Sequence, residues 1–195
     1  MRWAGLICAL SALITGCSFG NRTARLMYPP VDSNPPPAPV TSVALLAPED
    51  QRPEPRKVVG YVRNGLYMHT ADVETSDDVA AWVASALRVE LPRAGVALVD
   101  RAEGVPTVAI AILNVHSNAY FSYSGVVSLD VTVRRQGVLD SVSHAQGEGS
   151  GGVNWASSGD SHADTLAESV RDAARKAALA VRNALTATPP SAKNM

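Results

Sequence analysis

Cysteine and aromatic residues are scarce in this 195-residue chain, and neither charge is in marked excess. The two cysteines, Cys8 and Cys17, both lie near the amino terminus, so the rest of the chain can form neither a disulfide nor a thiolate metal site. The 17 basic and 18 acidic residues give a net charge of −1. This balance lacks the basic excess that nucleic-acid binding requires, and no nucleic-acid partner is expected.

Long hydrophobic runs are also missing, because no segment after residue 16 approaches the roughly 20 apolar residues of a transmembrane helix. Residues 4–14 form a short apolar stretch behind Arg2, as in a secretory signal. The tetrad Ile14-Thr15-Gly16-Cys17 closes this stretch and is typical of a bacterial lipobox. We therefore predict a signal peptide over residues 1–16 and a lipid-modified Cys17. The alternative is an ordinary cleaved signal that happens to precede a cysteine.

An acylated Cys17 would attach the chain to a membrane, since each buried CH₂ contributes about 0.8 kcal/mol. Ser18 stands where an aspartate would favour retention in the inner membrane. The predicted location is therefore the periplasmic face of the outer membrane. Without residues 1–16 the chain keeps 16 basic and 18 acidic residues, a net charge of −2.

A proline-rich stretch follows the predicted anchor. Residues 17–40 contain six prolines between positions 29 and 39 and predict a partly polyproline-II tether. The folded domain is expected over 41–186, and residues 187–195 are predicted to be a disordered tail. Because the tether has few apolar groups to bury, its deletion is expected to leave thermal stability almost unchanged.

Hydrophobic periodicity inside the domain predicts two helices and several strands. One helix should begin at Thr75 or Ser76 and end at Pro92 and Gly95, and an alanine-rich helix should begin near Ser161. Strands are expected at 42–48, 57–63, 96–99, 108–113, 127–134 and 139–148, the last three antiparallel, with a loop over 149–159. This pattern predicts an α+β two-layer sandwich, a mainly antiparallel sheet packed by two amphipathic helices.

Several of these segments carry a resemblance. Residues 59–65, residues 70–73 and the capped helix that contains Trp82 and ends at Gly95 resemble the YajG-type bacterial lipoproteins, and the similarity runs over about 43–181. More distantly, the order of elements is similar to α+β outer-membrane lipoproteins that assist lipopolysaccharide assembly or ABC-type transport. The resemblance implies the fold and no catalytic motif. The proline-rich tether is longer than the spacers it implies.

Candidate catalytic and ligand-binding patterns are weak. Residues 147–152 fit G-x-G-x-x-G, but the next helix begins too late and Glu148 would repel a phosphate, which favours a flexible loop. The four histidines lack metal-ligand spacing. Ser161, His162 and Asp164 are interpreted as helix caps and not as a catalytic triad. Asp130 and Asp140 are interpreted as solvated charges. No metal and no cofactor are therefore expected; the histidines are His69, His116, His144 and His162.

Aromatic residues cluster at one place. Residues 114–124 hold Tyr120, Phe121 and Tyr123, three of the ten aromatics, between two predicted core strands. One interpretation is a hairpin that covers the end of the core. The other is a partner-binding surface, with residues 64–69, which include Tyr67, as its adjoining rim.

The sequence thus predicts a membrane-anchored periplasmic lipoprotein without enzymatic activity. It would act as an accessory or binding subunit in cell-envelope biogenesis or transport, with an envelope protein as partner. A lipid or small-ligand carrier is one alternative, although an alanine-rich helix permits close packing and leaves little room for a cavity. An envelope enzyme with an unrecognised site is the other.

Overall fold

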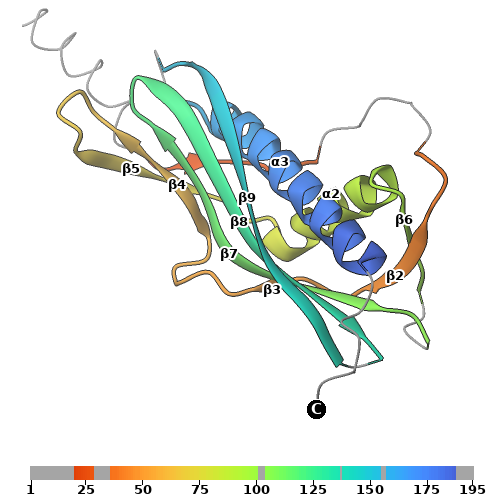
Figure 1. Cartoon of the computed structure of the whole chain (residues 1–195). Coiled ribbons are helices and arrows are strands. Elements are labelled where there is room, and N and C mark those ends of the chain that lie inside the picture. The colour runs from red at the N-terminus through yellow and green to blue at the C-terminus, as the bar shows by residue number, and fades with distance from the viewer. Residues whose placement is uncertain (1–19, 29–35, 101–103, 137, 155–156, 188–195) are drawn as a thin grey trace, which may run out of the picture.

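The computed structural model describes residues 20–28, 36–100, 104–136, 138–154 and 157–187. The predicted signal peptide, Cys17 and residues 188–195 lie outside the described residues. The predicted α+β class is confirmed: the described part combines a nine-stranded open sheet with two helices (Figure 1).

The sheet is built around β7 (Thr107–Ala119), which has a different partner along each edge. On one edge β7, β8 (Ser122–Arg135) and β9 (Val138–Val153) form an antiparallel meander, as predicted. All three strands are longer than predicted. Residues 114–124, expected to be a connecting loop, instead extend β7 and β8 to a tight turn at Tyr120 and Phe121.

Short strands lie parallel to β7 along its other edge. They are β2 (Thr41–Leu45), β3 (Glu49–Asp50) and β4 (Val58–Arg63), which pair with successive parts of β7. The sheet continues from β2 to the parallel strand β6 (Val96–Leu98), and from β4 to the antiparallel strand β5 (His69–Glu74). Parallel and antiparallel pairs therefore share one mixed sheet.

Both helices cover one face of this sheet and contact each other (Figure 1). α2 (Val79–Arg93) begins one turn later than predicted, because Asp78 caps it: its Oδ1 accepts from the amides of Ala80 and Ala81 at 2.9 and 3.1 Å. α3 (Gly159–Thr186) begins after its cap residue Ser158. Neither helix in the described ranges is long and apolar enough to cross a bilayer.

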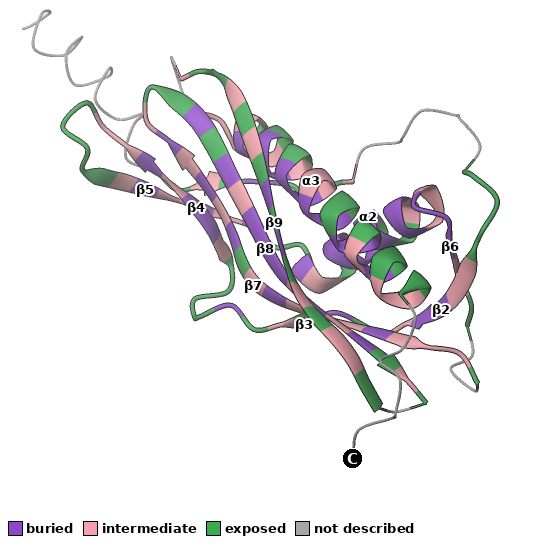
Figure 2. Cartoon of the chain, in the orientation of Figure 1, coloured by how far each residue is buried: buried purple, intermediate pink, exposed green. Residues whose placement is uncertain are grey.

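The core lies between this pair of helices and the sheet (Figure 2). Val131 of β8 is 1% exposed and pairs with Ile110 of β7, so the predicted register of β8 is confirmed. The buried stripe of α3 includes the predicted residues Leu166, Val170, Ala173, Ala174, Ala177 and Val181, whereas Leu185, predicted to belong to it, is half-buried.

Glycines bring α3 close to β8 and β9. A Cβ on Gly147 or Gly149 would overlap backbone atoms of α3, and one on Gly125 would lie 2.5 Å from Ser169 Oγ. Residues 149–153, predicted to be a loop, therefore belong to β9, and the glycine-rich motif is a contact surface for a helix. A phosphate-binding loop is excluded by this strand conformation.

The outer edge of β9 is partly covered by charged side chains of α3. Asp172 accepts from the Glu148 amide at 3.1 Å, and Glu168 accepts from the Ser150 amide at 2.9 Å. Lys176 donates to the Gln146 carbonyl at 2.9 Å. These contacts satisfy backbone groups that an edge strand would otherwise offer to another chain.

Residues 20–28 correct the predicted extent of the tether. β1 (Arg22–Thr23) pairs in parallel with β5, and Ala24 and Leu26 are buried. The Leu26 amide donates to Asp77 Oδ2 at 2.7 Å. Ala24, Leu26 and Tyr28 lie on one side of this segment, before the first proline at 29, so the segment can pack against the domain.

Candidate functional site

Two turns at one end of the sheet place five apolar or aromatic side chains there, four of them exposed and one, Tyr120, half-buried. The β4–β5 turn contributes Leu66, Tyr67 and Met68, and the β7–β8 turn contributes Tyr120 and Phe121. We call these five residues the aromatic tip. Leu66 is 79% and Phe121 67% exposed. The Tyr120 ring contacts Tyr67 edge-on with centroids 4.9 Å apart, and Phe121 with centroids 4.1 Å apart.

Asn64 shapes the first of these turns. Its Oδ1 accepts from the amides of Leu66 and Met68, both at 3.0 Å, and its carbonyl accepts from the Tyr67 amide at 2.8 Å. Tyr67 has a φ of 65°, an uncommon conformation for a residue other than glycine. The side chain of Asn64 thus holds Tyr67 in a position where its ring meets Tyr120.

Asn154 fixes the second turn. Its amide donates to the Phe121 carbonyl at 2.8 Å, and its Nδ2 donates to the Tyr120 carbonyl at 3.0 Å. The two turns are joined directly, because the Tyr120 hydroxyl donates to the Gly65 carbonyl at 3.2 Å. The tip is therefore ordered by specific hydrogen bonds.

Arg63 is the only formally charged side chain of β4 and the turn after it, among residues 58–68. Its guanidinium carbon lies 4.0 Å from the Tyr67 ring centroid and 4.7 Å from that of Tyr61. Its Nη2 donates to the Tyr61 hydroxyl at 2.8 Å. The tip thus has a cation stacked on its aromatic side.

Of the four predicted site residues, the structure brings together Tyr67, Tyr120 and Phe121 and separates Tyr123. Tyr123 is 5% exposed and faces α3, where its ring meets His162 edge-on at 5.1 Å. It lies inside β8, so side-chain alternation directs it to the face that α3 covers. Leu66 and Met68 belong to the predicted rim, residues 64–69, and stand on either side of Tyr67 in the turn.

Below the tip lies a buried polar cluster centred on His162. The imidazole is fully buried, with Nδ1 2.7 Å from Ser117 Oγ and Nε2 3.1 Å from Ser157 Oγ. Burial, with smaller effects of His116 and Arg22, lowers the pKa of His162 to about 4. His162 was interpreted as a helix cap, but Ser158 caps α3 and His162 connects α3 to β7.

The remaining candidate groups have local partners. His69 pairs with Asp72 and His144 with Asp130, both at 2.9 Å, while Asp140 pairs with Arg135 at 2.8 Å. Asp130 and Asp140 therefore do not form a carboxylate pair. Within the described ranges, no group of three or more histidine, cysteine, aspartate or glutamate side chains could hold a metal ion.

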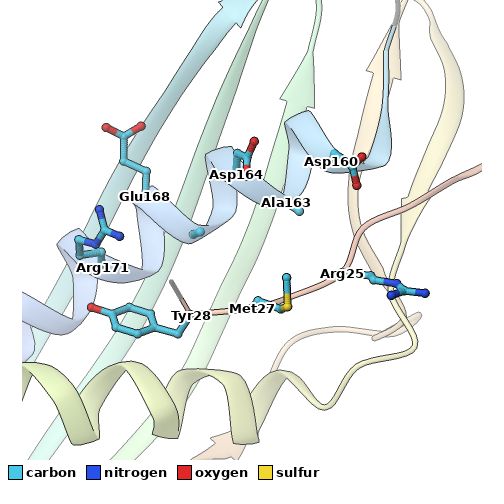
Figure 3. A pocket seen from close by; sticks show the side chains of 9 residues that line it. Arg25, Met27, Tyr28, Asp160, Ala163, Asp164, Glu168 and Arg171 are labelled. Carbon is cyan, nitrogen blue, oxygen red and sulfur yellow. The ribbon is translucent and has the colours of Figure 1, made fainter. Parts of the chain in front are cut away.

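A groove of about 620 Å³ runs between residues 25–28 and α3 (Figure 3). Arg171 of α3 reaches over the Tyr28 ring, with 6.0 Å between guanidinium carbon and ring centroid. The groove is bordered by charged side chains from both segments, namely Arg25, Asp160, Asp164, Glu168 and Arg171. The rest of the lining is apolar and consists of Met27, Ala163, Ala167 and the Tyr28 ring.

Comparison with known proteins identifies the fold class. No protein-family model matches the sequence, and no curated protein matches it either. Among solved structures, XCC0632 from Xanthomonas campestris, a DUF330 protein, has a TM-score of 0.54 at 10% identity, covering 84% of this chain and 95% of that chain. A second structure, described as an uncharacterized protein, has a TM-score of 0.50 at 11% identity, covering 84% and 98%.

At these identities the likeness shows a shared fold. The chain thus has an α+β architecture also found in a DUF330 protein. These neighbours do not carry the YajG name.

Proposed function

We propose that this chain is a lipoprotein of the YajG type, anchored through Cys17 to the periplasmic face of the outer membrane. There it acts as a non-catalytic accessory or binding subunit in cell-envelope biogenesis or transport. The observation that carries the proposal is the aromatic tip, an exposed apolar cluster at one end of the sheet. A lone monomer gains nothing by exposing such a cluster, whereas a binding surface does.

The order of the tip supports this function. Asn64 and Asn154 hold the two turns, and the Tyr120 hydroxyl joins them. A surface held in this way loses little conformational entropy when it binds. Mobile turns that merely cover the core would not need these contacts.

The two alternative functions have less support. A lipid carrier needs an apolar cavity between the helices and the sheet, but glycines of β8 and β9 allow α3 to pack directly on the sheet. An enzyme could use the contact between Ser117 and His162, but both side chains are closed to solvent. Ser157, not a carboxylate, contacts the second ring nitrogen of His162.

The proposal predicts that the tip is covered in the native envelope. The sequence makes this measurable, because the processed chain has no cysteine other than Cys17, which the lipid occupies. In cells that make the lipidated protein, Leu66→Cys and Phe121→Cys each introduce one free thiol at the tip. The matched control is Val138→Cys, which is 70% exposed at the opposite end of β8 and β9.

We expect maleimide to label both tip thiols in the purified acyl-free protein, in which Cys17→Ser removes the other thiol, and to label them poorly in intact envelopes. The thiol at position 138 should react in both. Equal labelling of all three positions in envelopes would contradict a binding role for the tip. The anchor is tested separately: Cys17→Ser should abolish incorporation of radiolabelled palmitate and release the protein from membranes.

A further inference from the structure

Resting on the proposed function, we infer that the occupant of the aromatic tip is the phospholipid surface itself. The tip inserts between headgroups beside the acyl anchor, so the domain stands on the membrane at this end. Three independent observations lead to this assignment: the direction of the chain, its length before the domain, and the chemistry of the two turns.

The direction of the chain follows from strand pairing. β1 runs parallel to β5, with Arg22 opposite Val73 and Thr23 opposite Glu74. Gly20 and Asn21, which precede Arg22, therefore lie on the side where β5 begins. β5 begins at His69, directly after the tip residue Met68. The chain thus reaches the domain from the end that carries the tip.

The length of the chain keeps the anchor near this end. Cys17 precedes Gly20, the first described residue, by three positions. Three residues span at most about 11 Å. An acyl chain on Cys17 therefore begins within about 11 Å of Gly20, and Gly20 itself lies on the tip side of β1. The opposite end of the sheet is where Arg135 pairs with Val138. It lies about 40 Å from the tip, the length of the 14 residues of β8.

The chemistry of the two turns fits a lipid interface. Residues 61–71 and 114–124 contain no aspartate or glutamate. Tyrosine is enriched at headgroup depth, and Leu66, Met68 and Phe121 provide apolar groups for the acyl boundary. Arg63, stacked on Tyr67, adds a positive charge that anionic headgroups attract.

A second copy of the chain or an envelope protein would need a larger surface than five side chains on two turns. A bilayer does not, because the anchor on Cys17 already holds the domain at the membrane. Attachment converts insertion of the tip into an intramolecular step at high effective concentration. Weak insertion is then enough to fix the orientation of the domain.

The experiment uses the full lipidated chain in vesicles of phosphatidylethanolamine and phosphatidylglycerol that contain no other protein. An environment-sensitive dye is attached to Leu66→Cys, Phe121→Cys or Val138→Cys. We expect a blue shift and a several-fold rise in fluorescence at positions 66 and 121, with quenching by lipids that carry a nitroxide near the headgroup. The dye at position 138 should keep its emission in water.

A second variant tests insertion rather than proximity. Leu66→Asp in the protein labelled at position 121 should reverse the blue shift while the vesicles still retain the protein through its lipid. The matched control, Val142→Asp near the opposite end, should leave the shift unchanged; Val142 is 60% exposed.

The outcomes separate this inference from the proposed function. Tip residues that remain in water on pure vesicles but are protected in native envelopes would overturn the lipid assignment, assign the tip to an envelope protein and preserve the binding function. Tip residues that are accessible in both would overturn both proposals.

Discussion

The hydroxyl oxygen of Tyr28 lies 2.6 Å from Oε1 of Glu90, and this hydrogen bond joins the segment before the proline-rich stretch to α2. Glu90 is only 3% exposed. Arg175 of α3 also reaches its carboxylate, with Nε 3.4 Å from Oε2. One buried carboxylate thus connects the amino-terminal segment and both helices.

Tyr28→Phe should lower the free energy of unfolding by about 1–3 kcal/mol, because a buried carboxylate loses its neutral hydrogen-bond donor. Urea denaturation of the processed acyl-free chain, with Cys17→Ser, measures the change. Tyr67→Phe is the matched control. Because Tyr67 is 56% exposed, this substitution should change the free energy of unfolding by no more than about 0.5 kcal/mol. Equal effects of the two substitutions would show that the Tyr28–Glu90 contact does not hold the segment.

The same contact predicts a loss of stability at alkaline pH. Burial, followed by the hydrogen bond and charge of Glu90, raises the pKa of Tyr28 to about 12 from its ordinary value of 10. The folded state therefore binds the phenolic proton more tightly than the unfolded state. This contribution is complete below pH 10 and is lost as the pH rises from 10 to 12. Tyr28→Phe should flatten the dependence of stability on pH in that window, and an unchanged slope would contradict the assignment.

Strand patterns could be predicted where burial imposes a strict alternation. Val127, Leu129, Val131 and Val133 alternate with polar residues, and β8 has the expected register. Residues 20–28 were misassigned because the prolines that follow dominate the composition, while only Ala24, Leu26 and Tyr28 mark the packing side. β5 was not predicted as a strand, since its short segment has little hydrophobic signal.

The candidate site was predicted in part for a related reason. Residues 114–124 are rich in asparagine, serine and aromatics, a composition that local rules assign to a turn. The actual turn is limited to Tyr120 and Phe121. Tyr123 is therefore part of β8, and the alternation of side chains along the strand places it on the face that α3 covers. The contact between Tyr67 and Tyr120 depends on β4 pairing with β7, which is a long-range relationship that neither segment encodes by itself.

His162 predicts a second dependence of stability on pH, of opposite sign. Its pKa is lowered to about 4 from 6.5. Between these two pH values the imidazole is therefore protonated in the unfolded state and neutral in the folded state. The contribution is complete above pH 6.5 and is lost as the pH falls toward 4, by about 3 kcal/mol in all. His162→Gln should reduce this slope in urea titrations between pH 4 and 6.5.

The remaining slope should include His116, whose pKa burial also lowers. His144→Gln provides the control. The side chain of His144 on β9 is about half exposed and pairs with the surface residue Asp130. If His144→Gln reduced the acid slope as much as His162→Gln, burial of His162 would not be its source.

Gly147→Ala should be among the most destabilising single substitutions in β9. An added Cβ would overlap the Ser169 carbonyl oxygen and the Ala173 amide nitrogen, and it would lie 2.8 Å from the Ala173 Cβ. These are backbone and β-carbon atoms of α3, so no flexible side chain can move aside. The helix must shift away from the sheet, at a cost of about 1–3 kcal/mol or more.

The matched control is Gly152→Ala on the same strand. Its added Cβ would meet nothing within 4 Å, and the expected change is within about 0.5 kcal/mol. Thermal melting and urea denaturation of the acyl-free chain measure both variants. If the two alanine variants were equally stable, α3 would not pack directly on the glycines of β9. The space between helix and sheet would then be large enough to restore the lipid-carrier alternative.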